Sequence, residues 1–441
     1  MQGCNGDKYG QIKVTRQKKS NQFKCTGICF LTSSSPTKFN NMTKQKDKNK
    51  FNLTNHSYFL YIWHGFKKDK LAMLGLSGII LLILVAVFAP VIANSRPLCV
   101  FSNKGIELPF FYYIFSPNSA EVLVGKFFNY LMLFVFFGFF VFLLFRKVKK
   151  IRLYLLLLLG LMLAVPFFTV KRVFDKTDWK YRVSNQQKNE VVISAPVPYG
   201  PFDLVGAPHE TSSKKHWLGT DNIGRDVLSR IIYGARVSIA VGIFATLISL
   251  IIGTAVGLIS GYLGGITDLL TMRVVEIIIC FPAFLLLLIL MATMMDLKFE
   301  QSILVVIPII GFLGWTGLSR IVRGEVLKQR SMQYVQACES LGMSNWRIMF
   351  VHLLPNVSGP IMVCAVFMVA ANVLAESGLS FLGFGVQPPT ASWGELLKEA
   401  FVDPLRYWNL TLWPGLLIFF TVLSFNLMGE GLRKSIDSKP R

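Results

Sequence analysis

The chain has 441 residues, of which 53% are hydrophobic and only 16% are charged. In a typical soluble domain about a quarter of the residues are charged. In this chain the apolar residues lie in uncharged runs of about 17 or more, which is the length of a membrane-spanning helix. The composition therefore excludes an ordinary soluble protein and indicates a polytopic membrane protein.

The formal net charge of +22 is large. Much of it lies in loops beside the apolar runs, where cytoplasmic Lys and Arg set the orientation of the spans. No basic face with interleaved aromatic residues accompanies it, so we expect no nucleic acid as a partner. The seven cysteines are scattered, without the paired spacing of a zinc site.

Residues 1–60 are polar and basic, without the apolar segment of a cleavable signal peptide. We interpret them as a disordered cytoplasmic extension, with Met42 as an alternative translation start. The segment 61–97 contains the first expected span, the uncharged run 71–93. Three residues before that run predict a cytoplasmic N-terminus: Lys67, Lys68 and Lys70.

The segment 98–209 contains two further apolar runs, 127–145 and 153–170. The hinge between them is RKVKKIR (146–152), whose basic residues place it on the cytoplasmic side. The two runs therefore predict a helical hairpin, followed by an extracytoplasmic loop. We expect the hairpin to pack against the remaining helices.

A polar segment leads into the next span and ends in HWLGTDNIGRDVLSRIIYGAR (216–236). Thr220 or Asp221 is predicted to cap a short helix with one apolar side. This pattern is typical of an amphipathic lead-in at the outer membrane–water interface; direct contact with a substrate stays open as the alternative. The apolar side consists of Val227, Leu228, Ile231 and Ile232.

Five apolar runs are expected to span the membrane in the remainder of the chain: 237–263, 277–295, 302–318, 361–375 and 412–428. With the three before them they make eight spans, with both chain ends in the cytoplasm.

Two of these five runs have distinctive patterns. In the first, glycines repeat every four residues and predict close approach of another helix: Gly253, Gly257 and Gly261. In the second, Pro282 predicts a kink, and Arg273 and Glu276 are spaced to form an ion pair on one helix face.

The stretch 330–356 is polar and lies between two spans. A helical turn opens at Gln336, Gly342 is predicted to end it in the left-handed conformation, and Ser344 to cap a second helix. Its basic flanks and the span count place this helix–Gly–helix elbow in the cytoplasm. An elbow with an apolar side needs a partner to cover it.

No catalytic constellation is found, so we expect no enzymatic activity and no cofactor or metal. The pattern G-x-x-x-x-G-K-[ST] is absent, which excludes a P-loop for ATP, and the five histidines are isolated.

Energy must come from an ion gradient or from another subunit. The intramembrane acids of a gradient-coupled carrier would be Glu276 and Glu376, and both are expected near span ends. A membrane scaffold without transport activity is a further alternative.

The elbow resembles the EAA loop of binding-protein-dependent ABC importer permeases. Gln336, Ala337 and Cys338 stand at the E-A-A positions, Gly342 at the glycine, and Leu354-Pro355 at the end of the motif. The second-subunit type of oligopeptide and dipeptide permease is matched further by the segment 216–238, by AESGLSFLGFGVQPPTASWGELL (375–397) and by GEGLRKSID (429–437).

The resemblance implies an all-α type I (MetI-like) importer permease with a core of six helices, to which the inserted hairpin is added. It implies a multi-pass protein of the bacterial inner membrane with a permease core at 210–437. The implied partners are a homologous sister permease, two cytoplasmic ATPases, an extracytoplasmic solute-binding protein and membrane lipid. Peptides are the expected cargo, with nickel, antibiotic peptides or sugars as alternatives.

The resemblance also implies two groups of functional residues. The expected ATPase-coupling surface is Gln336, Ala337, Leu341, Gly342, Met343, Trp346, Leu354 and Pro355. The expected structural residues of the family motifs are Gly219, Thr220, Asp221, Gly224, Arg225, Asp226, Glu376 and Gly383.

Overall fold

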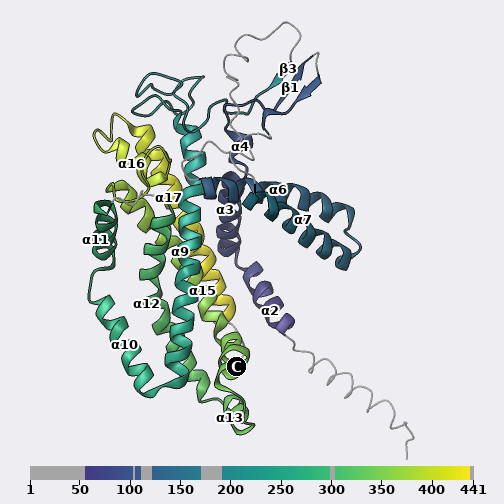
Figure 1. The fold of residues 1–441 in the computed structure, drawn as a ribbon, viewed down its shortest axis with the longest axis vertical. Helices are drawn as coiled ribbons and strands as arrows, with labels where there is room; N and C mark the ends of the chain where they lie inside the picture. Colours follow the sequence, from purple (N-terminus) through teal and green to yellow (C-terminus); the bar gives the residue numbers. More distant parts are fainter. Residues whose placement is uncertain (1–54, 103–104, 111–121, 170–190, 298–302, 438–441) are drawn as a thin grey trace, which may run out of the picture. The chain divides into compact units, whose positions relative to one another are not determined.

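The computed structural model describes residues 55–102, 105–110, 122–169, 191–297 and 303–437 (Figure 1). The expectations for residues 1–54, among them the alternative start at Met42, lie outside the described residues. The helices are α2 (Asn55–Lys68), α3 (Lys70–Val87), α4 (Ala89–Ile92), α6 (Val122–Leu144), α7 (Lys149–Thr169), α9 (Val227–Leu263), α10 (Gly265–Ile279), α11 (Ala283–Asp296), α12 (Ile303–Arg330), α13 (Gln333–Ser340), α14 (Asn345–Arg347), the π-helix η1 (Ile348–Leu353), α15 (Leu354–Phe381), α16 (Trp393–Ala400) and α17 (Trp408–Asp437).

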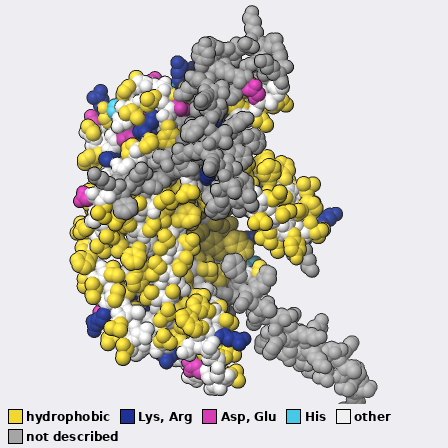
Figure 2. Space-filling view, in the orientation of Figure 1, with side chains coloured by type: hydrophobic (Ala, Val, Ile, Leu, Met, Phe, Trp, Pro, Cys, Tyr) yellow, Lys and Arg dark blue, Asp and Glu magenta, His cyan; other side chains and the backbone are white. Residues whose placement is uncertain are grey.

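Six helical segments of the described chain are long and apolar enough to cross a membrane: Lys70–Val87, Leu123–Leu144, Val227–Leu263, Ile303–Arg330, Asn345–Phe381 and Trp408–Asp437. The pair α10–α11 adds a broken seventh span at most, and α7 contains a shorter apolar stretch, Leu153–Leu163. Figure 2 shows hydrophobic side chains over the middle of the visible face and charged ones toward its two ends. The polytopic helical bundle is confirmed, with α3, α9, α10–α11, α12, α15 and α17 as its core.

The expectation of one kinked helix over 277–295 is wrong. Helix α10 ends at Ile279 and α11 begins at Ala283, and the two axes differ by 80°. Pro282 carries no N–H and forces the residue before it out of the helical conformation, so the chain breaks instead of bending. The predicted pair on α10 is confirmed, with 2.8 Å between Arg273 Nη1 and Glu276 Oε2.

The glycine repeat of α9 packs against α12, as expected. A Cβ atom at Gly257 would lie 2.8 Å from the carbonyl oxygen of Ser319, and one at Gly261 would lie 2.9 Å from Val326 Cβ. Both are closer than real Cβ contacts, so any larger residue would push the helices apart. The hydroxyl of Ser249 adds a hydrogen bond of 2.7 Å to the carbonyl oxygen of Gly311 across the same interface. These contacts hold α9 and α12 together as one rigid pair.

Helix α3 packs with similar closeness against α17. A Cβ atom at Gly75 would lie 2.6 Å from the carbonyl oxygen of Ser424, and a Cβ at Gly431 would collide with Ala72. The first and last helices of the core are therefore in direct contact.

The segment between α4 and α9 contains a small antiparallel sheet that sequence analysis did not anticipate. Its strands are β1 (Cys99–Ser102), β2 (Gly105–Glu107) and β3 (Val191–Ile193), in the order β2-β1-β3. Val100 is opposite Glu107 on one side and Val192 on the other. Strands of three or four residues leave too short an alternation of apolar and polar residues to be recognised.

The hairpin α6–α7 joins the core through apolar residues of α6 and through a buried polar contact. Arg236 of α9 donates to Asn129 Oδ1 of α6 at 2.9 Å and to the carbonyl oxygen of Ala86 of α3 at 2.6 Å. Asn129 is fully buried, and Phe127 and Phe244 make an edge-to-face contact beside it with ring centroids 5.4 Å apart. A single guanidinium therefore connects the inserted hairpin to two core helices.

Candidate functional site

The elbow between α12 and α15 has the local geometry that its glycine predicts. Helix α13 ends at Ser340, and Gly342 follows with φ of +70°. The N–H of Gly342 donates to the carbonyl oxygen of Glu339 at 2.9 Å, and the N–H of Met343 donates to that of Cys338 at 3.2 Å. This double hydrogen bond is the Schellman motif, which needs a left-handed residue at this position. Ser344 takes the N-cap position of α14 as expected, without a side-chain hydrogen bond.

One side of the elbow is buried on the protein's own helices. Val335, Ile348, Met349 and Leu353 are almost completely buried, in one cluster with residues of α9 and α12. The expectation that the apolar side needs another protein to cover it is therefore wrong for this half of the elbow.

Tyr262 at the end of α9 contacts both arms of the elbow. Its hydroxyl donates to Glu339 Oε1 of α13 at 3.2 Å and to Asn345 Oδ1 of α14 at 3.4 Å. The guanidinium of Arg330 lies over its ring, 5.7 Å from the centroid. These contacts fix the elbow to the helices that carry it.

The other side of the elbow is an exposed apolar surface, which we call the elbow face. Leu341 is 76% exposed and Trp346 is 61% exposed. Trp346 stacks on Phe350, with ring centroids 5.7 Å apart, and Val351 is exposed beside it. An exposed cluster of large apolar side chains in an otherwise packed segment indicates a contact surface.

The residues expected in the coupling surface fall into two groups. Gln336, Ala337, Leu341, Gly342, Trp346 and Pro355 are exposed, whereas Met343 and Leu354 are half-buried. Sequence analysis left out Phe350 and Val351. The spacing of four residues from Trp346 to Phe350 puts both rings on one helix face and was the available signal.

Both arms of the elbow continue into long helices. Helix α12 does not end with its apolar run near residue 318 but continues to Arg330. On the other side α14, η1 and α15 follow one another without interruption from Asn345 to Phe381. The π-helical segment, which no sequence pattern indicated, is of a kind often found at functional sites. A force on the elbow face therefore reaches two helices directly.

A buried ionic cluster lies at the end of the bundle opposite α13 (Figure 1). Arg230 of α9 contacts Asp221, Glu395 Oε2 at 2.5 Å and Glu399 Oε1 at 2.7 Å. Arg225 lies 2.6 Å from Asp221 Oδ2 and 3.0 Å from Glu399 Oε1. The cluster joins the loop before α9 to α16, and sequence analysis missed Arg230, Glu395 and Glu399 as its members.

The expected cap at Thr220 or Asp221 is wrong. Asp226 caps α9, and its Oδ1 accepts from the N–H of Ser229 at 2.8 Å. The helix that begins there is not a separate lead-in either, because α9 runs from Val227 to Leu263 without a break. The Asp221 carboxylate is instead used by the ionic cluster.

The other motif residues of this loop shape its turns. Gly219 and Gly224 have positive φ of +77° and +88°, and a Cβ atom at Gly224 would collide with the carbonyl oxygen of Gly206. Thr220 Oγ1 donates to the carbonyl oxygen of Ala207 at 2.5 Å. These residues hold the loop in shape.

Burial and charge act in opposite directions on the acids of the cluster. Burial alone would raise the pKa of Asp221, but Arg230 and the N–H and guanidinium of Arg225 outweigh it and hold that pKa below its usual value. For Glu395, burial outweighs the attraction of Arg230, and with the neighbouring Glu399 it raises the pKa to about 8. The two carboxyl groups therefore respond to pH in opposite ways.

Glu376 lies in the last turns of α15, which ends at Phe381, so its expected place near a span end is confirmed, and its side chain is fully buried. It lies inside α15, and its carboxylate accepts from Ser238 Oγ of α9 at 2.9 Å and from Ser380 Oγ at 2.8 Å. Ser380 Oγ also accepts from the N–H of Val386 at 3.1 Å, and Gly383 makes the turn between them with φ of +86°. The carboxylate thus joins α15, α9 and the turn after α15.

Among the described residues, no group of three or more His, Cys, Asp or Glu side chains has the arrangement to hold a metal ion. The described features are helices, a contact surface and buried ion pairs.

Comparisons with known proteins agree with this description. Residues 253–441 match the family model of the binding-protein-dependent transport system inner membrane component. Residues 57–105 match that of the N-terminal transmembrane domain of oligopeptide transport permease C.

Individual relatives match about half of this chain. The chain is 37% identical to a glutathione transport system permease protein of Pectobacterium atrosepticum, over 52% of this chain and 75% of that protein. It is 40% identical to a dipeptide transport system permease protein of Bacillus subtilis, over 52% of this chain and 70% of that protein. It is 38% identical to an oligopeptide transport system permease protein of the same organism, over 55% of this chain and 78% of that protein.

Proposed function

The chain belongs to the family of binding-protein-dependent transport system inner membrane components, and we propose that it is the permease subunit of an ATP-driven importer for short peptides. It forms half of the translocation path, and a homologous sister permease forms the other half. Two cytoplasmic ATPases supply the energy, and an extracytoplasmic binding protein delivers the solute.

The observation that carries the proposal is the elbow face. Leu341 and Trp346 are exposed on a segment that is otherwise anchored by buried residues and by Tyr262. In the proposed orientation this face points into the cytoplasm, where lipid cannot cover it. An ATPase with an apolar groove is the partner that the face fits.

Movement of the ATPases is transmitted through α12 and α15. When ATP closes the ATPase pair, each docked elbow follows its ATPase, and the helices continuous with the elbow tilt with it. The glycine contacts between α9 and α12 carry this movement into the core. ATP supplies the free energy that separates the two states, so the permease itself needs only two stable packings.

Peptides are proposed as the cargo because of the relatives' names. The permeases similar to this chain are named for glutathione, dipeptides and oligopeptides, all of which contain peptide bonds. Nickel and antibiotic peptides are the alternative cargoes of the same mechanism.

Glu376 favours a second candidate, a carrier driven by an ion gradient. A buried acid inside a spanning helix is the group that such a carrier protonates or uses to bind sodium. Here, however, serine hydroxyls from α9 and α15 satisfy the carboxylate and tie it to its neighbours. This environment supports a structural role.

Transport into membrane vesicles tests the proposal. Vesicles that contain this chain, its sister permease, the ATPases and the binding protein should take up a labelled dipeptide only with hydrolysable ATP. An ionophore that dissipates ion gradients should leave the rate unchanged. Uptake that stops with the ionophore and continues without ATP would favour the gradient-driven carrier. Competition by unlabelled oligopeptide, dipeptide and nickel then identifies the cargo.

A further inference from the structure

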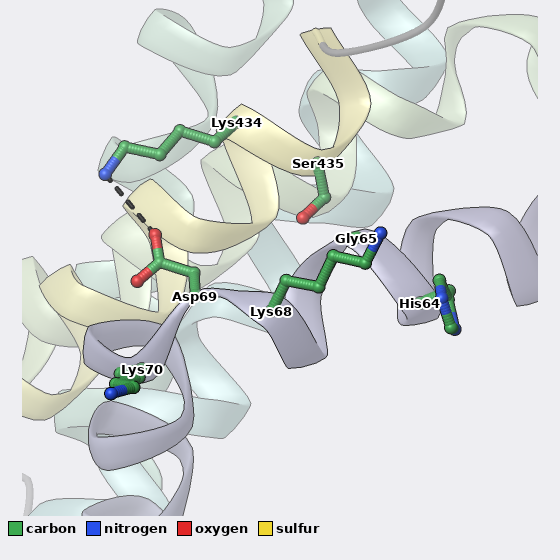
Figure 3. A pocket seen from close by; sticks show the side chains of 7 residues that line it. All are labelled: His64, Gly65, Lys68, Asp69, Lys70, Lys434 and Ser435. Carbon is green, nitrogen blue, oxygen red and sulfur yellow. Dashed lines mark hydrogen bonds and ion pairs between the residues drawn. The ribbon is translucent and has the colours of Figure 1, made fainter.

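A pocket of about 650 Å³ lies where α2 and α3 meet the end of α17 (Figure 3). We propose that it binds the phosphate headgroup of an anionic phospholipid at the cytoplasmic surface of the membrane. The proposal rests on the orientation argued above and not on the cargo. The pocket is lined by His64, Gly65, Lys68, Asp69, Lys70, Lys434 and Ser435.

The lining is positively charged. Three lysines stand against the single carboxylate of Asp69, which leaves two positive charges when His64 is neutral. Basic pockets at the cytoplasmic ends of membrane helices are suited to lipid headgroups, because each lysine near the surface attracts the anionic phosphate.

The carboxylate of Asp69 is already occupied. Its Oδ1 accepts from the N–H of Leu71 at 3.0 Å and from that of Ala72 at 3.3 Å, as the N-cap of α3. Its Oδ2 lies 3.4 Å from Lys434 Nζ (Figure 3). Asp69 therefore fixes the backbone at the junction between α2 and α3 and holds one lysine.

Lys68 and Lys70 are exposed, and within the described residues neither takes part in an ion pair. Two positive charges on either side of the α2–α3 junction are thus available for an anion. A phosphate diester with one negative charge matches them.

Apolar residues beside the pocket indicate that the anion has hydrocarbon chains. Leu71 and Leu74 of α3 are 57% and 61% exposed, directly after Lys70. On α2, Trp63 is 40% exposed, in the position of an interfacial anchor, and Lys67 Nζ lies 5.2 Å from its ring centroid. A headgroup in the pocket would place its acyl chains along α3, beside these side chains.

The pocket also bridges two helices that pack closely. A Cβ atom at Gly65 would lie 3.4 Å from Ser435 Cβ of α17, so the end of α2 touches the end of the last helix. A bound headgroup would contact lysines from both sides and connect the first and last core helices.

The test compares two double variants of the full-length chain purified in detergent. Lys68→Gln/Lys70→Gln removes two charges from the pocket. Arg146→Gln/Lys147→Gln removes two exposed charges from the turn between α6 and α7 and is the matched control. The melting temperature without added lipid checks that both variants fold.

Binding of phosphatidylglycerol is measured by native mass spectrometry and by its effect on the melting temperature. We expect the pocket variant to bind this lipid about tenfold more weakly than the parent chain, and the control variant to bind it as the parent does. Equal phosphatidylglycerol affinity in the two double variants would overturn the proposal.

Three further ligands identify the source of the phosphate. Phosphatidylcholine, whose headgroup carries no net charge, should bind the parent chain and the pocket variant equally weakly. Inorganic phosphate and glycerol phosphate should protect the parent chain far less than phosphatidylglycerol. If they protect it equally, and the pocket variant loses that protection, the pocket is a site for soluble phosphate and the lipid proposal is wrong.

Discussion

Arg230 of α9 and Glu395 of α16 lie 165 residues apart in the chain, yet Arg230 Nη2 and Glu395 Oε2 are 2.5 Å apart and both side chains are buried. The same guanidinium also contacts Asp221 and Glu399. Arg230 is therefore the one residue of the cluster that contacts all three of its carboxyl groups, whereas Arg225 contacts two of them.

Replacing Arg230 should strongly destabilise the protein. In Arg230→Gln the buried carboxyl groups lose their main partner, and breaking a buried pair in this way lowers the free energy of unfolding by about 3–5 kcal/mol. Unfolding by sodium dodecyl sulfate in mixed micelles measures the difference. Arg273→Gln is the control, because its pair with Glu276 is exposed and should contribute under about 1 kcal/mol. Equal effects of the two substitutions would contradict the account.

The stability of the junction between α9 and α16 should decrease at alkaline pH. Burial raises the pKa of Glu395 from 4.5 to about 8, so the folded protein holds this proton more tightly than the unfolded chain. The resulting stabilisation is complete below the unfolded pKa and is lost as the pH rises through about 8. Glu395→Gln cannot lose a proton and should remove this alkaline decrease when melting temperature is recorded against pH. An unchanged pH profile in the variant would refute the assignment.

Acid should act in the opposite direction through Asp221. Its pKa is held below the usual 3.8, so its stabilising effect is present above that value and is lost as the pH falls through the lowered pKa. Asp221→Asn should therefore flatten the acid side of the stability profile. In Glu395→Gln the acid side of the stability profile should be the same as in the parent chain. The two variants are therefore controls for each other.

Substitution of Gly342 by proline should abolish import while the protein stays in the membrane. Proline fixes φ near about −65°, whereas Gly342 has +70°, and it removes the N–H that donates to Glu339. No atom lies within 4 Å of a Cβ atom at Gly342, so the effect comes from the backbone and not from a clash. Gly324→Ala in α12, where the space is also open, should transport normally. Peptide uptake by the proline variant at the parent rate would count against the coupling role of the elbow.

Truncation of Trp346 should separate docking from folding. The side chain is exposed, so Trp346→Ala should change the free energy of unfolding by no more than about 0.5 kcal/mol. Trp346 is a central apolar residue of the elbow face, so its truncation should lower the affinity for the ATPase by at least about tenfold. Co-purification of the ATPase with the variant measures this loss. Leu405→Ala, at a position 90% exposed at the other end of the bundle, should leave the ATPase bound.

Local rules predicted several features correctly. The left-handed Gly342, the close packing of Gly257 and Gly261, and the Arg273–Glu276 pair each depend on residues near one another in the chain or on one helix face. The apolar runs predicted the helical bundle because their length matches the membrane.

The features that were missed depend on distant residues. Asp221 has the side chain of a cap, but its carboxylate is used by the nearby Arg225 and by Arg230, which the acids of α16 hold in place. Glu376 lies near a span end as expected, but the serine hydroxyls that surround its carboxylate come from α9 as well as α15 and were not anticipated. The proline at 282 was recognised but breaks the helix where a kink was expected, and the π-helix Ile348–Leu353 has no signal in the periodicity of the sequence.

The central claim is that the elbow face docks a cytoplasmic ATPase. A photo-crosslinking amino acid at Leu341, in the complete transporter, tests it most directly, with the same amino acid at Leu405 as the control. The account predicts a crosslink from position 341 to the ATPase subunit, with a yield that changes when ATP is added, and none from position 405. Absence of the ATPase from the crosslinked product at position 341, in a transporter that still imports peptide, would contradict the account.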